Sequence, residues 1–180
     1  MIKKIVITGG LGYIGTELCK IYSGVSWHHK IIVIDNRFIS ERVNQIQNWN
    51  MEFIHGDILD KELVNKYLKD ADIVHHLAGI TDVPRTKSEA SNEKDEKINL
   101  VGEKGTQNIL DAISDKCKII FPSTHVVYEG IDQVKINIQE DEETKPVLSY
   151  SSSKAVNEKQ LKNSGKNYII LRLGSVYGYS

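Results

Sequence analysis

Short apolar runs alternate with amphipathic segments along most of the chain. The apolar runs predict strands at Lys4–Thr8, Ile31–Asp35, Glu52–His55, Ile73–Leu77, Lys118–Pro122 and Tyr168–Leu173. A helical spacing of apolar residues predicts helices near Tyr13–Ser23, Lys61–Leu68, Lys97–Ile113 and Tyr150–Lys162. Strands of nearly continuous Ile and Val are typical of a parallel sheet that is buried on both faces. The alternation therefore predicts an α/β fold, a doubly wound parallel sheet with helices on both faces.

Two stretches depart from this alternation. Ser88–Lys97 is charged and contains several small residues, and Glu129–Leu148 contains four consecutive acidic residues and a proline. We expect both to be solvated loops, and we assign no function to the acidic run. The 180 residues are expected to form a single domain, residues 1–180, which is long enough to bury a substantial core.

The first predicted strand runs directly into a glycine-rich turn. The turn fits Gly-x-Gly-x-x-Gly when it is counted from Gly10, and Gly-x-x-Gly-x-x-Gly when it is counted from Gly9; both counts end with Gly12 and Gly15. In a dinucleotide-binding turn the first glycine reverses the backbone, the second approaches the pyrophosphate, and the third lets the helix pack on the sheet. The N-terminus of the following helix is then an anion site.

An acidic residue follows this turn at the spacing that dinucleotide binding requires. Asp35 ends the second predicted strand, about 20 residues beyond the glycines, where a carboxylate accepts a ribose hydroxyl. A purely structural turn is the alternative, and the glycines, helix and acid together favour a dinucleotide. A carboxylate there repels a 2′-phosphate and favours NAD over NADP. Arg37 is able to hold a phosphate, so NADP stays as the less favoured alternative.

A tyrosine and a lysine predict the chemistry. Tyr150 and Lys154 are four residues apart in a predicted helix and therefore share a face. The pKa of a free phenol is near 10, and an adjacent ammonium group lowers it toward a working pH. Ser123 and Thr124 end the fifth strand, where a hydroxyl either holds a substrate oxygen or only satisfies the loop backbone. The pair alone is often an ordinary surface contact, but its place after a dinucleotide pattern favours hydride transfer.

Composition excludes several other functions. The chain has 23 Lys and Arg against 24 Asp and Glu, so nothing indicates a nucleic-acid or membrane surface. No apolar run approaches the roughly 20 residues that span a bilayer. Cys19 and Cys117 are isolated and no secretory signal is present, which predicts reduced thiols in a cytoplasmic protein. His75 and His76 have no partner at ligand spacing, so we expect no metal site.

Seven segments, taken together, carry a family pattern. They are Thr8–Gly15, Val33–Asn36, His55–Ile58, His76–Gly79, Ser123–Tyr128, Tyr150–Lys154 and Leu171–Gly178. In this order, and over essentially the whole chain, they resemble the extended short-chain dehydrogenases/reductases, particularly the nucleotide-sugar epimerases and dehydratases. The fold expected from this resemblance is a Rossmann domain.

The resemblance implies a role for each matching residue. Thr124, Tyr150 and Lys154 would form the catalytic triad, with Lys154 also reaching the nicotinamide ribose. Asp35 would bind the adenosine ribose, while Asp57 and Ile58 would lie along the adenine. The residues implied for NAD are Gly9, Gly12, Tyr13, Ile14, Gly15, Asp35, Asn36, Asp57, Ile58, Leu77, Ala78, Gly79, Asn99, Tyr150, Lys154 and Leu173, and those implied for the substrate are Thr124 and Ser175.

The chain departs from the family pattern at three places. Family 4,6-dehydratases have Asp-Glu after the catalytic threonine, whereas this chain has His125-Val126 and lacks that acid–base pair. Ser175 stands where the family has asparagine. The Gly-Thr pair expected soon after Asn99 is delayed to residues 105–106, and residues 102–104 resemble an added helical turn.

The leading hypothesis is the NAD-binding and catalytic half of a nucleotide-sugar epimerase-like oxidoreductase. Family members continue beyond the point where this chain stops, at Ser180, so we expect the substrate-binding domain to be absent. A shortened chain, a gene fragment and a minimal natural protein all fit this ending. The alternatives in function are an NAD-binding module without turnover and a reductase or dehydrogenase of another secondary alcohol. The resemblance also implies a homodimer through the helices near Lys97–Ile113 and Tyr150–Lys162.

Overall fold

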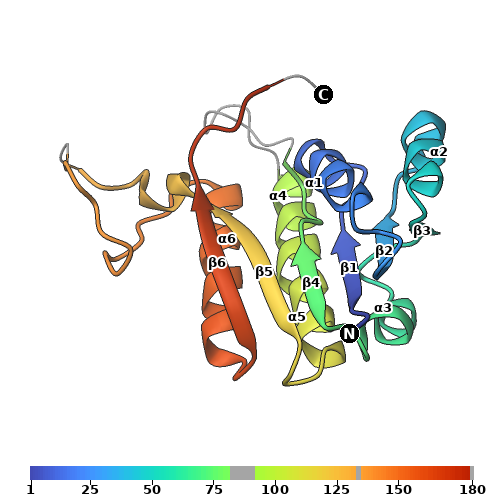
Figure 1. Cartoon of the computed structure of the whole chain (residues 1–180). Helices are drawn as coiled ribbons and strands as arrows, with labels where there is room; N and C mark the ends of the chain where they lie inside the picture. The colour runs from blue at the N-terminus through green and yellow to red at the C-terminus, as the bar shows by residue number, and fades with distance from the viewer. Residues whose placement is uncertain (82–91, 133–134, 179–180) are drawn as a thin grey trace.

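Six parallel strands form one sheet in the order β3-β2-β1-β4-β5-β6 (Figure 1). The computed structural model describes residues 1–81, 92–132 and 135–178. The strands are β1 (Lys4–Thr8), β2 (Lys30–Asp35), β3 (Glu52–His55), β4 (Ile73–His76), β5 (Lys118–Thr124) and β6 (Asn167–Leu173). The order reverses between β1 and β4, and this switch point is where an open α/β sheet binds its ligand. The predicted doubly wound parallel sheet is confirmed.

Helices cover both faces of this sheet. They are α1 (Tyr13–Ser23), α2 (Ser40–Asn48), α3 (Lys61–Leu68), α4 (Asn92–Asn99), α5 (Gly105–Ala112) and α6 (Ser149–Asn163), with a π-helix at Leu100–Lys104 and a 3-10 helix at His125–Tyr128. Alternate strand residues separate the core in two: Ile5 and Ile7 pack with α1 and α2, while Val6 packs with α3, α5 and α6. Among the described residues, no helix combines the length and the apolar character that crossing a membrane requires.

The helix α2 was not predicted. Its sequence, SERVNQIQN, is mostly polar, and only Val43 and Ile46 are buried. Two apolar positions in nine residues give too weak a helical pattern to be recognised. The stretch Ser88–Lys97 was predicted as a loop, but α4 already begins at Asn92; the residues before it, 82–91, lie outside the described part of the chain.

The predicted helix Lys97–Ile113 is interrupted in the structure. Leu100–Lys104 forms a π-helix between α4 and α5, so the extra residues widen one turn and do not add an ordinary one. Gly102 allows α6 to lie close, because a Cβ there would be 2.1 Å from the Ser153 hydroxyl oxygen. The Asn157 side-chain amide donates to the Gly102 carbonyl at 3.0 Å. The π-helix is thus fastened directly to α6.

A buried ion pair joins α6 to the sheet. Arg172 of β6 donates from Nε and Nη2 to the two Glu158 oxygens, at 2.9 and 2.6 Å. The Ser123 hydroxyl donates to the same carboxylate at 2.6 Å. Burial alone raises the pKa of Glu158, but the hydrogen bonds from Arg172 and Ser123 outweigh it and hold the pKa below its usual value. Arg172 also donates to the Glu140 carbonyl and contacts the Tyr128 hydroxyl, so this one guanidinium joins β6 to α6, to the 3-10 helix at His125–Tyr128 and to the loop before α6.

We predict that Arg172→Ala lowers the free energy of unfolding by about 3 kcal/mol, because Glu158 stays buried without its main partner. Lys162→Ala is the matched control: Lys162 contacts the same carboxylate at 3.6 Å but is 51% exposed, so it should cost less than about 0.5 kcal/mol. Urea unfolding at neutral pH measures both. Equal costs for the two variants would contradict the prediction.

The same pair predicts a pH dependence. The pKa of Glu158 is lower in the folded chain than in the unfolded chain, so its contribution is complete above the unfolded value, about 4.3, and is lost as the pH falls through the folded value. The cost of Arg172→Ala should therefore shrink in acid, where the carboxyl is neutral in both proteins. Urea midpoints at neutral and acidic pH check this.

Candidate functional site

The carboxyl ends of the strands open onto a cleft of about 1100 Å³. Thr124 lines it, as do most residues predicted for the cofactor: Gly9, Gly12, Tyr13, Ile14, Gly15, Asp35, Asn36, Asp57, Ile58, Leu77, Ala78, Gly79, Tyr150 and Leu173. Asn99, Lys154 and Ser175 are not among its lining residues. Asn99 is exposed at the end of α4, where the π-helix begins and Leu100 and Val101 face the cleft instead.

The glycine turn leaves no room for a side chain at Gly9, Gly10 or Gly15. Gly9 has φ +70°, and a Cβ there would lie 2.6 Å from the Ala78 amide nitrogen. A Cβ at Gly15 would lie 2.5 Å from the Gly9 carbonyl oxygen, and one at Gly10 would lie 2.2 Å from Val33. Gly9 therefore makes the reversal, Gly15 allows α1 to approach the turn, and Gly10 packs on β2. The pattern Gly-x-x-Gly-x-x-Gly, which begins at Gly9, therefore describes this turn.

The N-terminus of α1 is open to an anion. The helix has eleven residues, its N-cap is Gly12, and no side chain caps it or places a negative charge in its first turn. A Cβ at Gly12 would meet the Gly9 carbonyl at 3.1 Å and the Arg37 guanidinium at 3.7 Å. The first amide groups therefore remain available, which fits a pyrophosphate on this turn.

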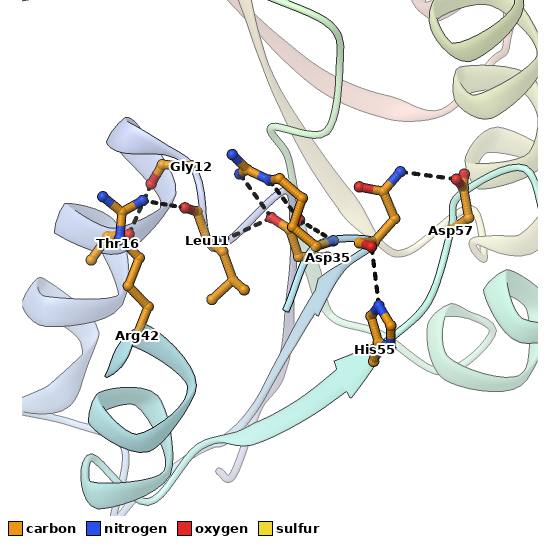
Figure 2. Close-up of polar contacts among 9 residues, drawn as sticks. Leu11, Gly12, Thr16, Asp35, Arg42, His55 and Asp57 are labelled. Carbon is orange, nitrogen blue, oxygen red and sulfur yellow. Dashed lines mark hydrogen bonds and ion pairs between the residues drawn. The ribbon is translucent and has the colours of Figure 1, made fainter. Parts of the chain in front are cut away.

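Asp35 lies beside this turn at the end of β2 (Figure 2). Its carboxylate is 3% exposed and accepts the Leu11 amide at 2.9 Å and the Arg37 amide at 3.0 Å. The Arg37 side chain donates to both carboxylate oxygens, from Nε at 3.2 Å and from Nη2 at 3.3 Å. Arg42 of α2 donates to the Leu11 carbonyl from the other side of the turn.

A second group of contacts fixes the neighbouring loop after β3. The Asn36 amide group donates to Asp57 at 3.0 Å, and His55 contacts the Asn36 carbonyl at 3.0 Å (Figure 2). Asp57 also accepts the Leu59 amide at 2.9 Å. These bonds tie the ends of β2 and β3 together, next to the buried side chain of Ile58.

A buried histidine, His76, supports the loop after β4 through Thr8. His76 contacts the Thr8 hydroxyl through Nδ1 and the Thr106 hydroxyl through Nε2, both at 3.0 Å. Thr8 in turn accepts the Ala78 amide at 3.3 Å. Burial, with a smaller effect of the Lys154 charge, lowers the pKa of His76 to about 3, so the ring is neutral. Within the described ranges, His, Cys, Asp and Glu form no group of three or more suited to a metal ion.

Thr124 and Tyr150 bring hydroxyl groups to the opposite end of the cleft. Thr124 accepts the Val126 amide at 3.3 Å, and its own hydroxyl proton is not donated to any residue the structure describes. The Tyr150 hydroxyl likewise has no partner among the described residues. The Glu129 carboxylate accepts the amides of Val147 and Leu148, at 2.8 and 2.7 Å, and thereby holds the start of the helix that carries Tyr150.

Lys154 lies beneath these hydroxyls. Its ammonium donates to the Pro122 carbonyl at 3.0 Å and lies 4.4 Å from the centre of the Phe121 ring, but 5.9 Å from that of Tyr150. Burial lowers the pKa of Lys154 to about 8 and raises the pKa of Tyr150 above 10. The expected lowering of the phenol pKa is therefore not present in this structure, because desolvation dominates and the ammonium faces other groups.

Sequence reasoning missed several residues of the cleft. Arg42, Lys94, Lys97, Leu100 and Val101 line it, from α2, α4 and the π-helix. Of these, the lysines carried a weak signal, because cations before a predicted helix could face a phosphate-binding cleft. Arg42 carried none, because α2 itself was not recognised.

Comparisons with known proteins agree with this geometry. A model of the NAD dependent epimerase/dehydratase family matches residues 5–180. CDP-paratose 2-epimerase of Salmonella typhi is 32% identical and aligns with 97% of this chain and 58% of its own length. The chain spans about half the length of the curated relatives it matches.

Two solved structures have a similar fold over nearly the whole of this chain. The UDP-N-acetylglucosamine 4-epimerase of Methanobrevibacter ruminantium M1, in complex with UDP-N-acetylmuramic acid, has a TM-score of 0.77 and 30% identity, over 95% of this chain and 54% of that one. The Bordetella bronchiseptica enzyme WbmH, in complex with NAD+, has a TM-score of 0.81 and 27% identity, over 99% of this chain and 57% of that one.

The glycine turn gives a prediction with an internal control. Gly9 and Gly165 have nearly the same φ, +70° and +69°, but a Cβ at Gly165 would meet nothing within 4 Å. Gly165→Ala should cost about 1 kcal/mol for the left-handed backbone alone. Gly9→Ala should cost about 3 kcal/mol or more, because the methyl group also collides with Ala78. Urea unfolding measures both, and equal costs would show that the collision is relieved.

Proposed function

This chain belongs to the NAD-dependent epimerase/dehydratase family, and on that premise we propose that it forms the NAD-binding and catalytic part of a nucleotide-sugar epimerase-like oxidoreductase. One observation carries the proposal: a single cleft joins the glycine turn and Asp35 at one end to Thr124 and Tyr150 at the other. Relatives with epimerase names and neighbours with bound NAD support it.

The residues at the first end fit NAD. The open N-terminus of α1 and the turn from Gly9 to Gly15 would hold the pyrophosphate, and Asp35 the adenosine ribose. Asp57 and Ile58 line the adjacent part of the cleft, where the adenine would lie. When bound, NAD supplies a reversible hydride acceptor. Lys154, beneath the cleft, would reach the nicotinamide ribose.

Residues at the other end of the cleft would transfer the proton of a sugar hydroxyl. Tyr150, as its phenolate, would remove the proton from a hydroxyl of the sugar while the C–H bond on the same carbon breaks. The free Thr124 hydroxyl would donate to the oxygen that becomes the carbonyl. The Lys154 ammonium would stabilise the phenolate. In epimerisation Tyr150 returns the proton after hydride has been added back to the opposite face of that carbon, so the reaction consumes no net reductant.

The residues after Thr124 favour epimerisation over dehydration. Elimination of water needs an acid and a base next to the threonine, and His125 and Val126 occupy those positions. Val126 cannot exchange a proton, and His125 is exposed, with Nδ1 on the Leu173 carbonyl at 3.2 Å. Relatives named as epimerases of nucleotide sugars support a nucleotide sugar as the substrate class. A homodimer and a cytoplasmic location, both expected from the sequence, stay predictions that sedimentation and fractionation would test.

We predict that the chain binds NAD+ in a one-to-one complex and that Asp35→Asn weakens binding by about 10-fold or more. A hydrogen bond to a charged acceptor contributes about 1.5–3 kcal/mol, and about 1.4 kcal/mol is tenfold in affinity. Isothermal titration calorimetry measures the dissociation constants. Asp70→Asn is the control, because Asp70 is exposed and pairs with Lys4, the first residue of β1, at the opposite end of that strand from the glycine turn. Failure to bind NAD+ would overturn the proposed function.

We predict that Tyr150→Phe reduces turnover of UDP-sugars at least 100-fold while NAD+ affinity changes less than threefold, because general-base catalysis contributes about 10² to 10⁴ in rate. Chromatography of a UDP-sugar panel incubated with the chain and NAD+ measures turnover. Tyr168→Phe, on an exposed position of β6, is the control. Tight NAD+ binding without turnover by the unaltered chain would instead show a cofactor-binding module.

A further inference from the structure

The π-helix between α4 and α5 joins two walls of the cleft. Leu100 lines the cleft two residues before Gly102, and Tyr150 lines it three residues before Ser153, one turn of α6 away. The two walls touch at Gly102 and Ser153, because a Cβ on Gly102 would lie only 2.1 Å from the Ser153 hydroxyl oxygen. The distance between Leu100 and Tyr150 across the cleft therefore depends on how closely the π-helix approaches α6.

Two side-chain amides of α6 hold the π-helix in this position. The Asn157 amide donates to the Gly102 carbonyl and the Gln160 amide to the Glu103 carbonyl, both at 3.0 Å. Asn157 also donates to the Gln160 side-chain oxygen at 3.0 Å, so the two amides orient each other. Asn157 is 2% exposed, and a buried amide without its acceptor is costly. The π-helix cannot move away from α6 without losing these bonds.

The Ser153 hydroxyl limits the approach from the other direction. Gly102 does not have a positive φ, so its backbone would accept alanine, and the hydroxyl is the obstacle. Without this hydroxyl, the nearest atoms to a Cβ on Gly102 would be Ser153 Cβ at 3.5 Å and Asn157 Oδ1 at 3.6 Å, which are ordinary contact distances. The amides and the hydroxyl together determine the separation of the two helices.

We propose that Gly102 and Ser153 are positioning residues for the cofactor: their contact sets the distance between the wall at Leu100 and the helix that carries Tyr150, and so the fit of the cleft to NAD. Neither residue is among those that line the cleft. A ligand between two walls contacts both at only one separation, and a gap of about 0.5–1 Å loses roughly a quarter to a half of the attraction. The proposal rests on the proposed function, since it needs NAD in this cleft.

Calorimetric titration of the whole chain with NAD+ tests the contact. Gly102→Ala should raise the dissociation constant about fivefold or more, because the added methyl group forces the two walls apart. In a Ser153→Ala background, which lacks the obstacle, the same substitution should change the constant less than about twofold. Ser152→Ala is the matched control: it removes a hydroxyl from the neighbouring residue of α6 and should not rescue Gly102→Ala.

Thermal unfolding of these variants gives a second readout. Alanine is favoured over glycine within helices, so Gly102→Ala should raise the unfolding midpoint in the Ser153→Ala background and lower it in the unaltered chain. If Gly102→Ala alone does not fold, Asn157→Leu tests the same contact from the other side. It removes the amide that holds Gly102 without adding bulk, and it should weaken NAD+ about threefold or more.

The outcomes separate the two proposals. If NAD+ binds and Gly102→Ala lowers the unfolding midpoint without changing the dissociation constant, the contact is only structural, and the positioning role fails while the proposed function stands. Weak binding that persists in Gly102→Ala/Ser153→Ala would also overturn the positioning role, since the collision would not be its cause. If the unaltered chain does not bind NAD+, the proposed function fails and the positioning role fails with it.

Discussion

The close approach of two backbone turns, after β1 and after β4, is the constraint on which the cleft depends. Gly9 lies so near the Ala78 peptide that no Cβ fits between them, and its φ of +70° excludes most other residues as well. The Gly9 amide donates to the Ile34 carbonyl at 2.7 Å, and the Leu77 amide to the Thr8 carbonyl at 3.0 Å. These contacts bring the ends of β1, β2 and β4 together, so that Asp35, the α1 N-terminus and the loop at Ala78 face one space.

The other end of the cleft is built from side-chain charges. Glu158 and Arg172 fasten α6 to the sheet, and Glu129 holds its first turn. No glycine is needed in the first turn of α6, and several polar contacts together hold this helix against the sheet. This difference has a physical reason: the turn after β1 must leave its amides open for an anion, whereas α6 has only to be placed accurately beside Thr124. The buried, paired Glu158 carboxylate gives such placement, because leaving it unpaired would be costly.

The sequence predicted the first end of the cleft better than the second. Glycine spacing and the acid after β2 are local patterns with fixed geometric meaning, so they identified Gly9, Gly12, Gly15 and Asp35 from neighbours in the chain. The sequence did not show whether the pattern starts at Gly9 or Gly10. The positive φ of Gly9 and its close approach to Ala78, about seventy residues away, show in the structure that it starts at Gly9. The α2 helix was missed because only two of its residues are buried.

Contacts between distant segments determine the features of the site that the sequence could not reveal. The position of Asn99 depends on whether the added residues form a further turn or a π-helix, and in the structure they form a π-helix whose Gly102 packs closely on Ser153 of α6. The charge of Lys154 depends on burial beneath Phe121, which no spacing of tyrosine and lysine reveals.

The two ends of the cleft differ in how they stabilise charge: Asp35 is paired with donors, whereas Tyr150 and Lys154 are desolvated. At Asp35 four donors contact the carboxylate, so a ligand there exchanges hydrogen bonds with Arg37 for its own, and the net contribution of Asp35 to binding is the difference between them. At the other end, burial raises the pKa of Tyr150 and lowers the pKa of Lys154, so both side chains favour their neutral forms. A charge on either side chain is opposed until polar or charged groups replace the missing solvent. Affinity at the ribose end and proton transfer at the catalytic end therefore depend on different residues, and a substitution at one end should leave the other largely unchanged.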